Sequence, residues 1–253
     1  MILREVMLLE EIAPLETIYM RFARGEISDM GRDFCDMSGP YDREYEDFCL
    51  INAMLPRVYY PQLQDNLFER LTQSIAEQLI GNSATLDYDQ FLSKKPSKTD
   101  AAFPMHQDLG YWPAGTPDTI TTTCSLALDD ADEENGCLMV VPGSHLEPKL
   151  RAHRPVFQSK DGGVRDGGHT LAIELTPQDK CVSLPLKAGD ITVHNERIIH
   201  GSGGNISDRW RRTYVIAHRT SACVEYERNI GFTHSHNDRI QWESYLESLR
   251  GTA

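Results

Sequence analysis

Hydrophobic and polar residues alternate along several short stretches of the chain, with the period of two expected of β-strands that bury one face. Residues typical of turns separate these stretches. This pattern favours a jelly roll or barrel over repeated βαβ units. The predicted strands cover residues 84–93, 119–128, 137–141, 171–175, 181–186, 190–199 and 211–219.

The N-terminal third of the chain has a helical pattern instead. A segment that begins at Pro61 carries leucine or isoleucine at every fourth position and ends at Gly81, a good C-terminal stop. Such a stripe is typical of a helix that packs on a sheet, rather than of a cofactor site. Its members are Leu63, Leu67, Leu71, Ile75 and Leu79.

Length and composition agree with one enzyme domain, since 253 residues suffice for a single β-rich domain with a full core. We expect residues 1–83 to form a mostly helical support, residues 84–222 a jelly-roll core and residues 223–253 a C-terminal tail. The six cysteines have no paired or metal-like spacing, so we interpret them as reduced, mostly buried thiols. They occupy positions 35, 49, 124, 137, 181 and 223.

Charge and hydropathy bear on the location of the protein and on its partners. The first ten residues lack the charged-then-apolar pattern of a signal peptide, and charges interrupt every long apolar run. The chain has 38 acidic and 25 basic residues, a formal net charge of −13. We therefore expect a cytoplasmic protein with neither a membrane nor a nucleic-acid partner.

The tripeptide His106-Gln107-Asp108 is the strongest chemical signal. In a β-strand, residues i and i+2 point to the same side, so His106 and Asp108 can bind one metal ion while Gln107 points away. A second imidazole from a distant strand would complete a two-histidine, one-carboxylate set. That set holds Fe(II) on one face and leaves three positions open for a cosubstrate and oxygen.

His200 is the predicted third ligand, at the end of the 190–199 strand and before Gly201, which permits a close approach of backbone or ligand. His194 is a weaker rival because it lacks the glycine-serine context and an arginine at the right distance. We interpret His145 as a turn or rim residue. His234 and His236 have metal-like spacing but no third partner, so we expect them on a solvated loop.

Arg211 is the predicted anion-binding residue. The period-two pattern puts it on one strand face with three small or apolar residues, a setting that suits bidentate capture of the far end of a dicarboxylate. Arg212 falls on the opposite face, where we expect it to be solvated. The other residues on the Arg211 face are Thr213, Val215 and Ala217.

These motifs, taken together, resemble the phytanoyl-CoA dioxygenase family of Fe(II)/2-oxoglutarate oxygenases. The resemblance covers about residues 86–220 and rests on three ordered stretches: Pro104 to Pro113, Glu134 to His145, and His200-Gly201-Ser202 through Arg211. It implies a mainly β fold, a cupin-like double-stranded β-helix with N-terminal helices. It also implies metal ligands at His106, Asp108 and His200, with 2-oxoglutarate on Arg211 and a minor contact from Ser202.

Some relatives bind the cosubstrate with a further lysine just before a proline. Here that stretch ends in Lys94-Lys95-Pro96, and both lysines remain possible. We favour Lys94, because it shares a predicted inward face with apolar residues and with Gln90, which we also assign to the cosubstrate side. An aromatic residue of some relatives is replaced by Ser125. The predicted inward face is Leu86, Tyr88, Gln90, Leu92 and Lys94, with Asp87 and Asp89 on the other face.

The predicted reaction is oxidation of an unactivated C–H bond, by hydroxylation, ring closure or desaturation, with Fe(II), 2-oxoglutarate and O2 and with release of succinate and CO2. Two alternatives belong to other classes. A zinc-dependent hydrolase could use the same three ligands and a metal-bound water, but it would not need a dicarboxylate-binding arginine. A non-catalytic jelly-roll binding module would have no reason to keep all four site residues in register.

Only the net charge of the chain indicates the class of substrate. A CoA thioester is polyanionic and would be repelled by an acidic protein unless a local basic patch prevailed. We therefore predict a small neutral or cationic polar substrate of natural-product type, such as an aminated sugar or an amino-acid-derived metabolite. Its predicted walls are Tyr111, Trp112 and the acidic turn at Asp129–Glu134, while acidity for solubility alone stays the alternative. Residues 145–170 are either a lid or an insertion.

Overall fold

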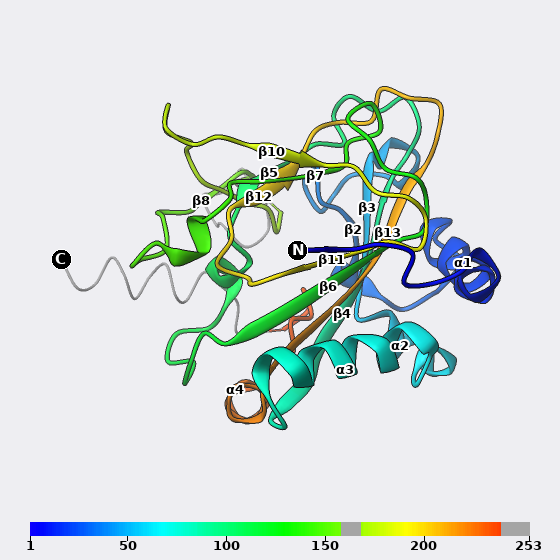
Figure 1. The fold of residues 1–253 in the computed structure, drawn as a ribbon. Helices are drawn as coiled ribbons and strands as arrows, with labels where there is room; N and C mark the ends of the chain where they lie inside the picture. Colours follow the sequence, from blue (N-terminus) through cyan, green and yellow to red (C-terminus); the bar gives the residue numbers. More distant parts are fainter. Residues whose placement is uncertain (158–167, 239–253) are drawn as a thin grey trace.

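The protein is built on two antiparallel sheets (Figure 1). Residues of both sheets line a cavity between them. The computed structural model describes residues 1–157 and 168–238. The large sheet has the order β1-β11-β6-β13-β4-β3-β2, and the small sheet has the order β10-β7-β12-β5. The strands of the large sheet are β1 (Ile2–Leu3), β2 (Phe34–Asp36), β3 (Leu50–Met54), β4 (Ala84–Lys94), β6 (Thr121–Ala127), β11 (Ile191–His194) and β13 (Arg211–Thr220). Those of the small sheet are β5 (Phe103–His106), β7 (Leu138–Val140), β10 (Val182–Leu184) and β12 (His200–Ser202).

Helices cover the outer face of the large sheet (Figure 1). The cavity lies against the inner face of this sheet. Alternation along β13 shows the division: Tyr214 and Ile216 join the core on the helix side, whereas Thr213 and Val215 line the cavity. The aromatic rings of Tyr19, Phe91 and Tyr214 meet in that core. The helices are α1 (Leu9–Ala23), α2 (Pro56–Tyr59), α3 (Leu67–Ile80) and α4 (Ser221–Asn229), and a short ribbon pairs β8 (Arg154–Pro155) with β9 (Leu171–Ala172).

The predicted helix is present but begins later than its leucine pattern indicates. Pro61 opens only a short 3-10 turn, and α3 begins after Asn66, whose side chain accepts a hydrogen bond from the Glu69 backbone N–H at 3.1 Å. It ends at Gly81, which adopts a φ of +97°. Of the predicted stripe, Leu63 lies in the core and Leu67, Leu71 and Ile75 pack against it, as expected. Leu79 is 52% exposed, and the most deeply buried residues of α3 are Phe68, Thr72 and Ala76.

The description of the N-terminal third as mostly helical is incomplete, since β2 and β3 extend the large sheet beyond β4. The predicted single strand over 190–199 is wrong. β11 ends at His194, the chain turns with a hydrogen bond from the Ile198 N–H to the Asn195 carbonyl, and His200 begins β12 in the other sheet. β-Branched residues at 198 and 199 suit a strand in either place, so alternation alone does not show the break.

A bulge in β4 corrects the predicted faces of two residues. Ala217 pairs with Tyr88 but His218 pairs with Leu86, so Asp87 is the extra residue. Leu86 therefore packs against the core on the helix side. Asp87 turns instead toward Arg219 on the inner face, with 2.9 Å between its carboxylate and the guanidinium Nε.

The structure bears on the predictions for the cysteines, for membrane-spanning helices and for two segments of the chain. All six cysteines are free, and five of them are buried while Cys181 is exposed, which agrees with the prediction. Within residues 1–157 and 168–238, no helix is both long and apolar enough to cross a membrane. Of the segment 145–170, residues 158–167 lie outside the described residues, as do residues 239–253 of the predicted tail.

Candidate active site

The two predicted histidine ligands and the carboxylate converge on one point between the sheets. His106 ends β5 and lies directly opposite His200 of β12, and their rings are 4.3 Å apart between centroids. The Oδ1 atom of Asp108 is 3.1 Å from His106 Nε2 and 3.5 Å from His200 Nε2. One ligand atom from each of the three residues lies within 4.8 Å of the others, which is close enough to hold one metal ion.

Close packing of β5 against β12 makes this convergence possible. A Cβ atom at Gly201 would lie 2.7 Å from the Phe103 carbonyl oxygen and 2.7 Å from the Met105 sulfur. Any other residue at this position would therefore separate the two strands. The expectation that glycine after His200 permits a close backbone approach is confirmed.

Backbone carbonyl groups orient both imidazoles. His106 Nδ1 is 2.8 Å from the Pro104 carbonyl, and His200 Nδ1 is 3.1 Å from the Ile198 carbonyl. A proton on Nδ1 donates to the carbonyl and leaves the Nε2 lone pair free, which is the tautomer that a metal ligand requires. In both cases the acceptor is the residue two positions earlier, so the local backbone conformation fixes the ring.

The protonation states also suit metal binding. Burial lowers the pKa of His200 to about 3, so its imidazole is neutral at physiological pH. Burial would raise the pKa of Asp108, but the neighbouring His200 and His106 hold that pKa well below its usual range. The site therefore presents a carboxylate and an unprotonated imidazole without the need to remove protons first.

Two basic residues, Lys94 and Arg211, form a pair at the far end of the same cavity, which Arg211 lines. Lys94 and Arg211 are direct partners across β4 and β13, and their exposed fractions are 0% and 7%. Lys94 Nζ donates to Ser202 Oγ at 2.7 Å and also contacts the Gly203 carbonyl. Arg211 has no carboxylate partner among the described residues, and its buried Nε donor is unpaired. Burial and then the charge of Arg211 lower the pKa of Lys94 to about 6.

Unpaired polar atoms along the cavity wall indicate an absent polar ligand. Besides Arg211 Nε, the Thr192 hydroxyl and both ring nitrogens of His194 are buried without a hydrogen-bond partner among the described residues. These residues line the cavity that reaches from Asp108 to Arg211, together with Gln90. Since buried donors are nearly always satisfied, the arrangement fits a dicarboxylate that spans from the three ligands to the cation pair.

Lys95 and Arg212 lie outside this cavity. Lys95 donates to the Tyr45 carbonyl at 2.9 Å and lies over the Tyr45 ring, so the structure favours Lys94 as the inward lysine. The expectation that Arg212 is solvated is wrong, because its guanidinium pairs with Asp129 at 2.6 Å and with Glu16 at 2.5 Å. Ser125, which replaces an aromatic residue of some relatives, faces the cavity.

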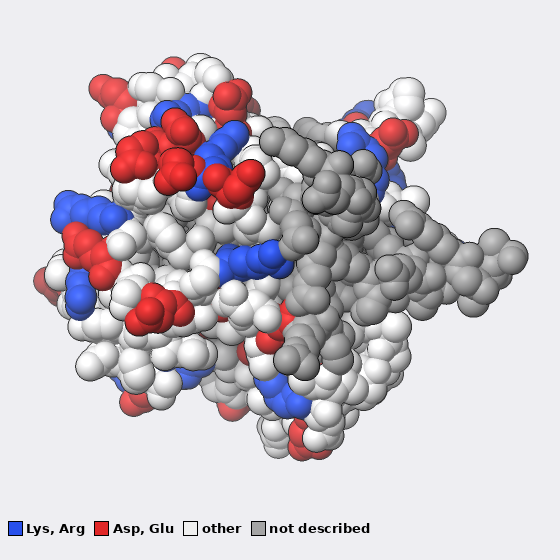
Figure 2. All heavy atoms as spheres, turned by 180° about the vertical axis from the view of Figure 1, so that it is seen from behind, with Lys and Arg blue, Asp and Glu red and all other residues white. Residues whose placement is uncertain are grey.

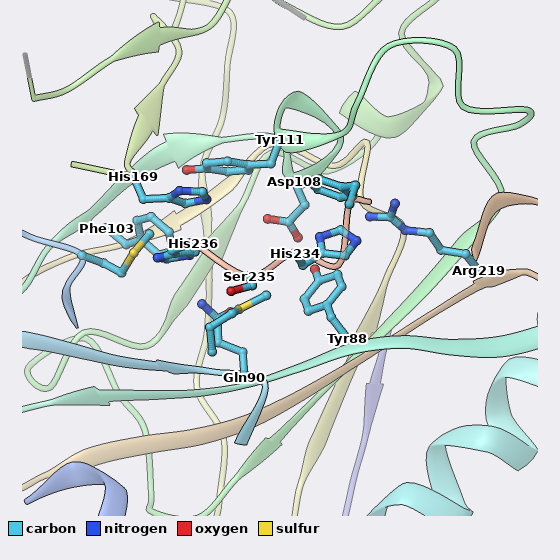
Figure 3. Close-up of a pocket in the computed structure, with 13 residues that line it drawn as sticks. Tyr88, Gln90, Phe103, Asp108, Tyr111, His169, Arg219, His234, Ser235 and His236 are labelled. Carbon is cyan, nitrogen blue, oxygen red and sulfur yellow. The ribbon is translucent and has the colours of Figure 1, made fainter. Parts of the chain in front are cut away.

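A second cavity also reaches Asp108 but is lined by neither Lys94 nor Arg211. Figure 3 shows the residues around it. Tyr111 forms one wall: its hydroxyl accepts a hydrogen bond from the Leu171 N–H, and its ring stacks on His169 with an interplanar angle of 8°. Gln90 lines both cavities and donates to the Asn52 side chain at 2.6 Å. Other wall residues are Met37, Met54, Tyr88, Phe103 and Phe232.

The segment after α4 closes this second cavity, and the expectation of a solvated loop for His234 and His236 is wrong. Their exposed fractions are 8% and 2%, and both line the cavity with Ser235 (Figure 3). Asp33 anchors the segment: it accepts from the Ser235 hydroxyl at 2.7 Å and from the His236 N–H at 2.6 Å. A contact between residues 200 positions apart leaves no local pattern in the sequence.

Trp112, a predicted substrate wall, does not line the cavity next to Asp108 but lines a separate surface groove. It is 3% exposed, its indole N–H donates to Glu196 at 2.6 Å, and the Arg219 guanidinium lies 3.3 Å from its ring centroid. Arg219 is fully buried among three carboxylates: Asp87, Glu196 and Glu227. Extending the period-two face of β13 from Arg211 to residue 219 would have identified it as an inward residue.

A second group of residues of metal-binding type lies in this cluster. Nearby basic side chains already neutralise its carboxylates. Asp87, Glu227 and His234 bring their donor atoms close together. The guanidinium groups of Arg219 and Arg228 contact the same two carboxylates, at 2.9 and 2.6 Å from Asp87. Asp87 raises the pKa of His234 although burial opposes it. We interpret the group as an ion network because a divalent cation would repel both guanidinium groups.

The acidic turn at Asp129–Glu134 is not a cavity wall either, which corrects the prediction. Asp129 pairs with Arg212, Asp130 with Lys187 at 2.6 Å, and Asp132 with Arg209 at 2.7 Å. The turn thus lies on the surface and is largely neutralised by its own neighbours. Sequence reasoning missed His169, Met37 and Met54, whose positions depend on contacts between distant segments.

Comparison with known proteins identifies the family. The model of the phytanoyl-CoA dioxygenase family matches residues 51–213, which is more than half of the chain, so the protein belongs to this family. The chain is similar to a structure of EvdO2 from Micromonospora carbonacea var. aurantiaca complexed with 2-oxoglutarate. Identity is 27% with a TM-score of 0.65, over 87% of this chain and 85% of that one. This likeness confirms the predicted jelly-roll fold.

Curated relatives are similar over shorter stretches. The peroxisomal phytanoyl-CoA dioxygenase of Rattus norvegicus is 30% identical over 138 residues, which are 54% of this chain and 39% of that protein. A probable α-ketoglutarate-dependent hypophosphite dioxygenase of Stutzerimonas stutzeri is 28% identical over 176 residues, or 65% of this chain and 57% of that protein. The match thus spans only about half the length of these relatives.

Burial of Lys94 yields a prediction about stability. Its pKa is about 6 in the folded protein, against 10.5 ordinarily, so between these values the unfolded chain holds a proton that the folded chain lacks. Stability should therefore rise with pH in that range. Relative to Lys94→Met, the wild type should gain up to about 1.4 kcal/mol per pH unit between about pH 6.5 and pH 9 in urea unfolding. Exposed Lys149, changed to Met, is the control and should show no such trend.

Proposed function

We propose that this protein is an Fe(II)- and 2-oxoglutarate-dependent oxygenase that oxidises a C–H bond of a small molecule. The observation that carries the proposal is a single cavity that is lined by Asp108 and His200 at one end and by Arg211 at the other. His106 completes the ligand set at the first end, and buried Lys94 lies beside Arg211 at the second. A buried guanidinium without a carboxylate partner is costly, so Arg211 needs an anionic ligand, and a carboxylate bound there would also favour the charged form of Lys94. A 2-oxoglutarate molecule has a carboxylate for each end.

Each residue then has a definite task. His106, Asp108 and His200 hold Fe(II), which when bound supplies the oxidative decarboxylation of 2-oxoglutarate by O2, with succinate and CO2 as products. Arg211 binds the 5-carboxylate of the cosubstrate through its guanidinium fork, and Lys94 adds a second charge there. Ser202 keeps Lys94 in place through their hydrogen bond. Gln90 separates the cosubstrate side of the cavity from the substrate side.

The two rival functions account for less of the structure. A zinc hydrolase would use the three ligands and a water molecule, but it would have no use for buried Lys94 and Arg211. A binding module would bear the cost of burying both cations without a reaction to require them. The oxygenase proposal explains both ends of the cavity.

The substrate is proposed to bind in the second cavity, between Tyr111 and the segment Phe232 to His236. Charges in its described lining are balanced: three carboxylates compensate Arg219, and Asp108 is reserved for the metal. A cationic amine would find no free carboxylate there. Among the molecules that the acidic composition suggests, the structure therefore favours an uncharged polar one, with Gln90 and Ser235 as hydrogen-bonding groups beside aromatic walls.

A second candidate substrate is an acyl-CoA thioester, and a specific surface feature supports it. Beyond the metal-binding segment, a groove is lined by Lys149, Arg154 and Arg197, for which no ion pair is found in the described part of the chain. The Gln107 backbone N–H donates to His153 of this groove at 3.1 Å, so the groove adjoins the metal ligands. On the face in Figure 2, by contrast, basic and acidic side chains are interspersed where they are described.

Loss of the carboxylate ligand tests the reaction class. Asp108→Ala removes a proposed metal ligand and should abolish substrate-triggered succinate formation. The loss should exceed the roughly 10–100-fold effect of removing a residue that only supports a ligand. The measurement is succinate release with Fe(II), 2-oxoglutarate and a metabolite mixture, with Zn(II) in parallel. Asp130→Ala, which removes a surface carboxylate, should keep full activity. Substrate conversion by the zinc form would instead support the hydrolase.

Two adjacent arginines provide a matched test of cosubstrate binding. Arg211→Ala removes a charge-assisted pair worth about 1.5–3 kcal/mol, so the KM for 2-oxoglutarate should rise roughly ten- to a hundredfold. Arg212→Ala breaks the ion pairs with Asp129 and Glu16 and should lower stability while that KM stays the same. Equal effects of both variants on KM would contradict the assignment.

Substrate class can be tested by rate and salt dependence. Succinate production should be triggered by uncharged, hydroxyl-bearing compounds at the same rate in low and moderate salt, because no charge pairing contributes to binding. Acyl-CoA thioesters should be poor triggers. Should a thioester be the efficient one, Lys149→Glu and Arg154→Glu should reduce its kcat/KM and flatten its salt dependence, which would establish the groove as the CoA site and refute the neutral substrate.

A further inference from the structure

His194 lies between the three proposed metal ligands and the cosubstrate cavity. It is the last residue of β11, and the chain then turns and returns as β12 with His200, so the two rings face each other at 5.1 Å between centroids. Alternation along β11 turns both Thr192 and His194 toward the cavity. The side chain of His194 is only 10% exposed.

The two oxygens of Asp108 have different surroundings. Oδ1 faces the two ligand histidines, at 3.1 Å from His106 Nε2 and 3.5 Å from His200 Nε2. Oδ2 is the oxygen nearer to His194, at 3.6 Å from His194 Nε2. The carboxylate thus presents one oxygen to the metal position and the other to a third imidazole.

His194 itself has no other use within the described structure. Both of its ring nitrogens are buried and without a hydrogen-bond partner, although buried polar groups are almost always satisfied. It is not part of the set of donor atoms that converge closely enough for one ion, which consists of His106, Asp108 and His200. At 3.6 Å, Nε2 and Oδ2 are just too far apart for a hydrogen bond, and a small movement of either side chain would form one.

We propose that His194 is a positioning residue: its Nε2–H donates to Asp108 Oδ2 and so holds the carboxylate with only Oδ1 toward the metal. This inference rests on the metal site of the proposed function. A carboxylate free to turn could bind through both oxygens and occupy a coordination position that the cosubstrate or oxygen needs. The N–H of His194 therefore strengthens metal binding and keeps that position open.

Variants that differ in the reach of one N–H group test the proposal. The amide nitrogen of Gln can take the place of imidazole Nε2, whereas the shorter Asn reaches only the place of Nδ1, and Leu has no donor. Metal-free wild type and the variants His194→Gln, His194→Asn and His194→Leu would be titrated with Co(II) in the absence of 2-oxoglutarate. The dissociation constant and the visible Co(II) spectrum, which depends on coordination number, would both be recorded.

We expect His194→Asn and His194→Leu to bind Co(II) roughly 10–100-fold more weakly than the wild type, with a changed spectrum. His194→Gln should retain both properties. Thermal unfolding of the Gln and Asn variants gives the stability control, since both are polar and differ by one methylene group. Equal Co(II) affinity and equal spectra for Gln and Asn would overturn the positioning role. Failure of the wild type to bind Co(II) or Fe(II) at all would instead refute the proposed function.

Discussion

Burying a charged side chain is costly unless another charge or a ligand compensates it, and this constraint organises the interior of the protein. Three arginines of β13 show its outcomes. Arg219 is fully buried and contacts three carboxylates, and Arg212 is half-buried with two. Arg211 is also buried, but it has no carboxylate partner in the described chain. The first two are compensated within the fold, and the third indicates where a ligand binds.

The ion network around Arg219 also connects the jelly roll to the segment that closes the substrate cavity. Asp87, freed by the bulge in β4, accepts from Arg228 of α4 at 2.6 Å and pairs with His234 at 2.8 Å. Asp33, from the opposite end of the chain, anchors Ser235 and His236. Polar contacts of the N-terminal region, the core and the C-terminal segment thus jointly set the position of the cavity wall. Segments far apart in the described sequence therefore form this cavity together.

Function and stability are in tension at the cosubstrate end. Lys94 lies 0% exposed beside Arg211, and its pKa of about 6 reflects the cost of placing an ammonium group there. Such unfavourable burial of basic groups is usual at binding sites, where a ligand completes interactions that the protein leaves open. The unpaired Thr192 hydroxyl on the same wall has the same explanation.

The sequence alone determined those features that depend on local period and spacing. Alternation located β4, β6 and β13, the face of Arg211 and the inward position of Lys94, because the side-chain period of a strand is a property of the strand itself. The spacing of His106 and Asp108 and the glycine after His200 likewise anticipated the convergence that the structure shows.

Only the tertiary structure decided which distant groups meet. It separated β11 from β12, moved Leu86 and Asp87 to opposite faces through one bulge, and buried His234 and His236 that a local reading placed in solvent. It also gave Arg212 its carboxylate partners and placed Trp112 against Arg219. These outcomes depend on strand register and on contacts across up to about 200 residues of chain, and neither leaves a periodic trace in the sequence.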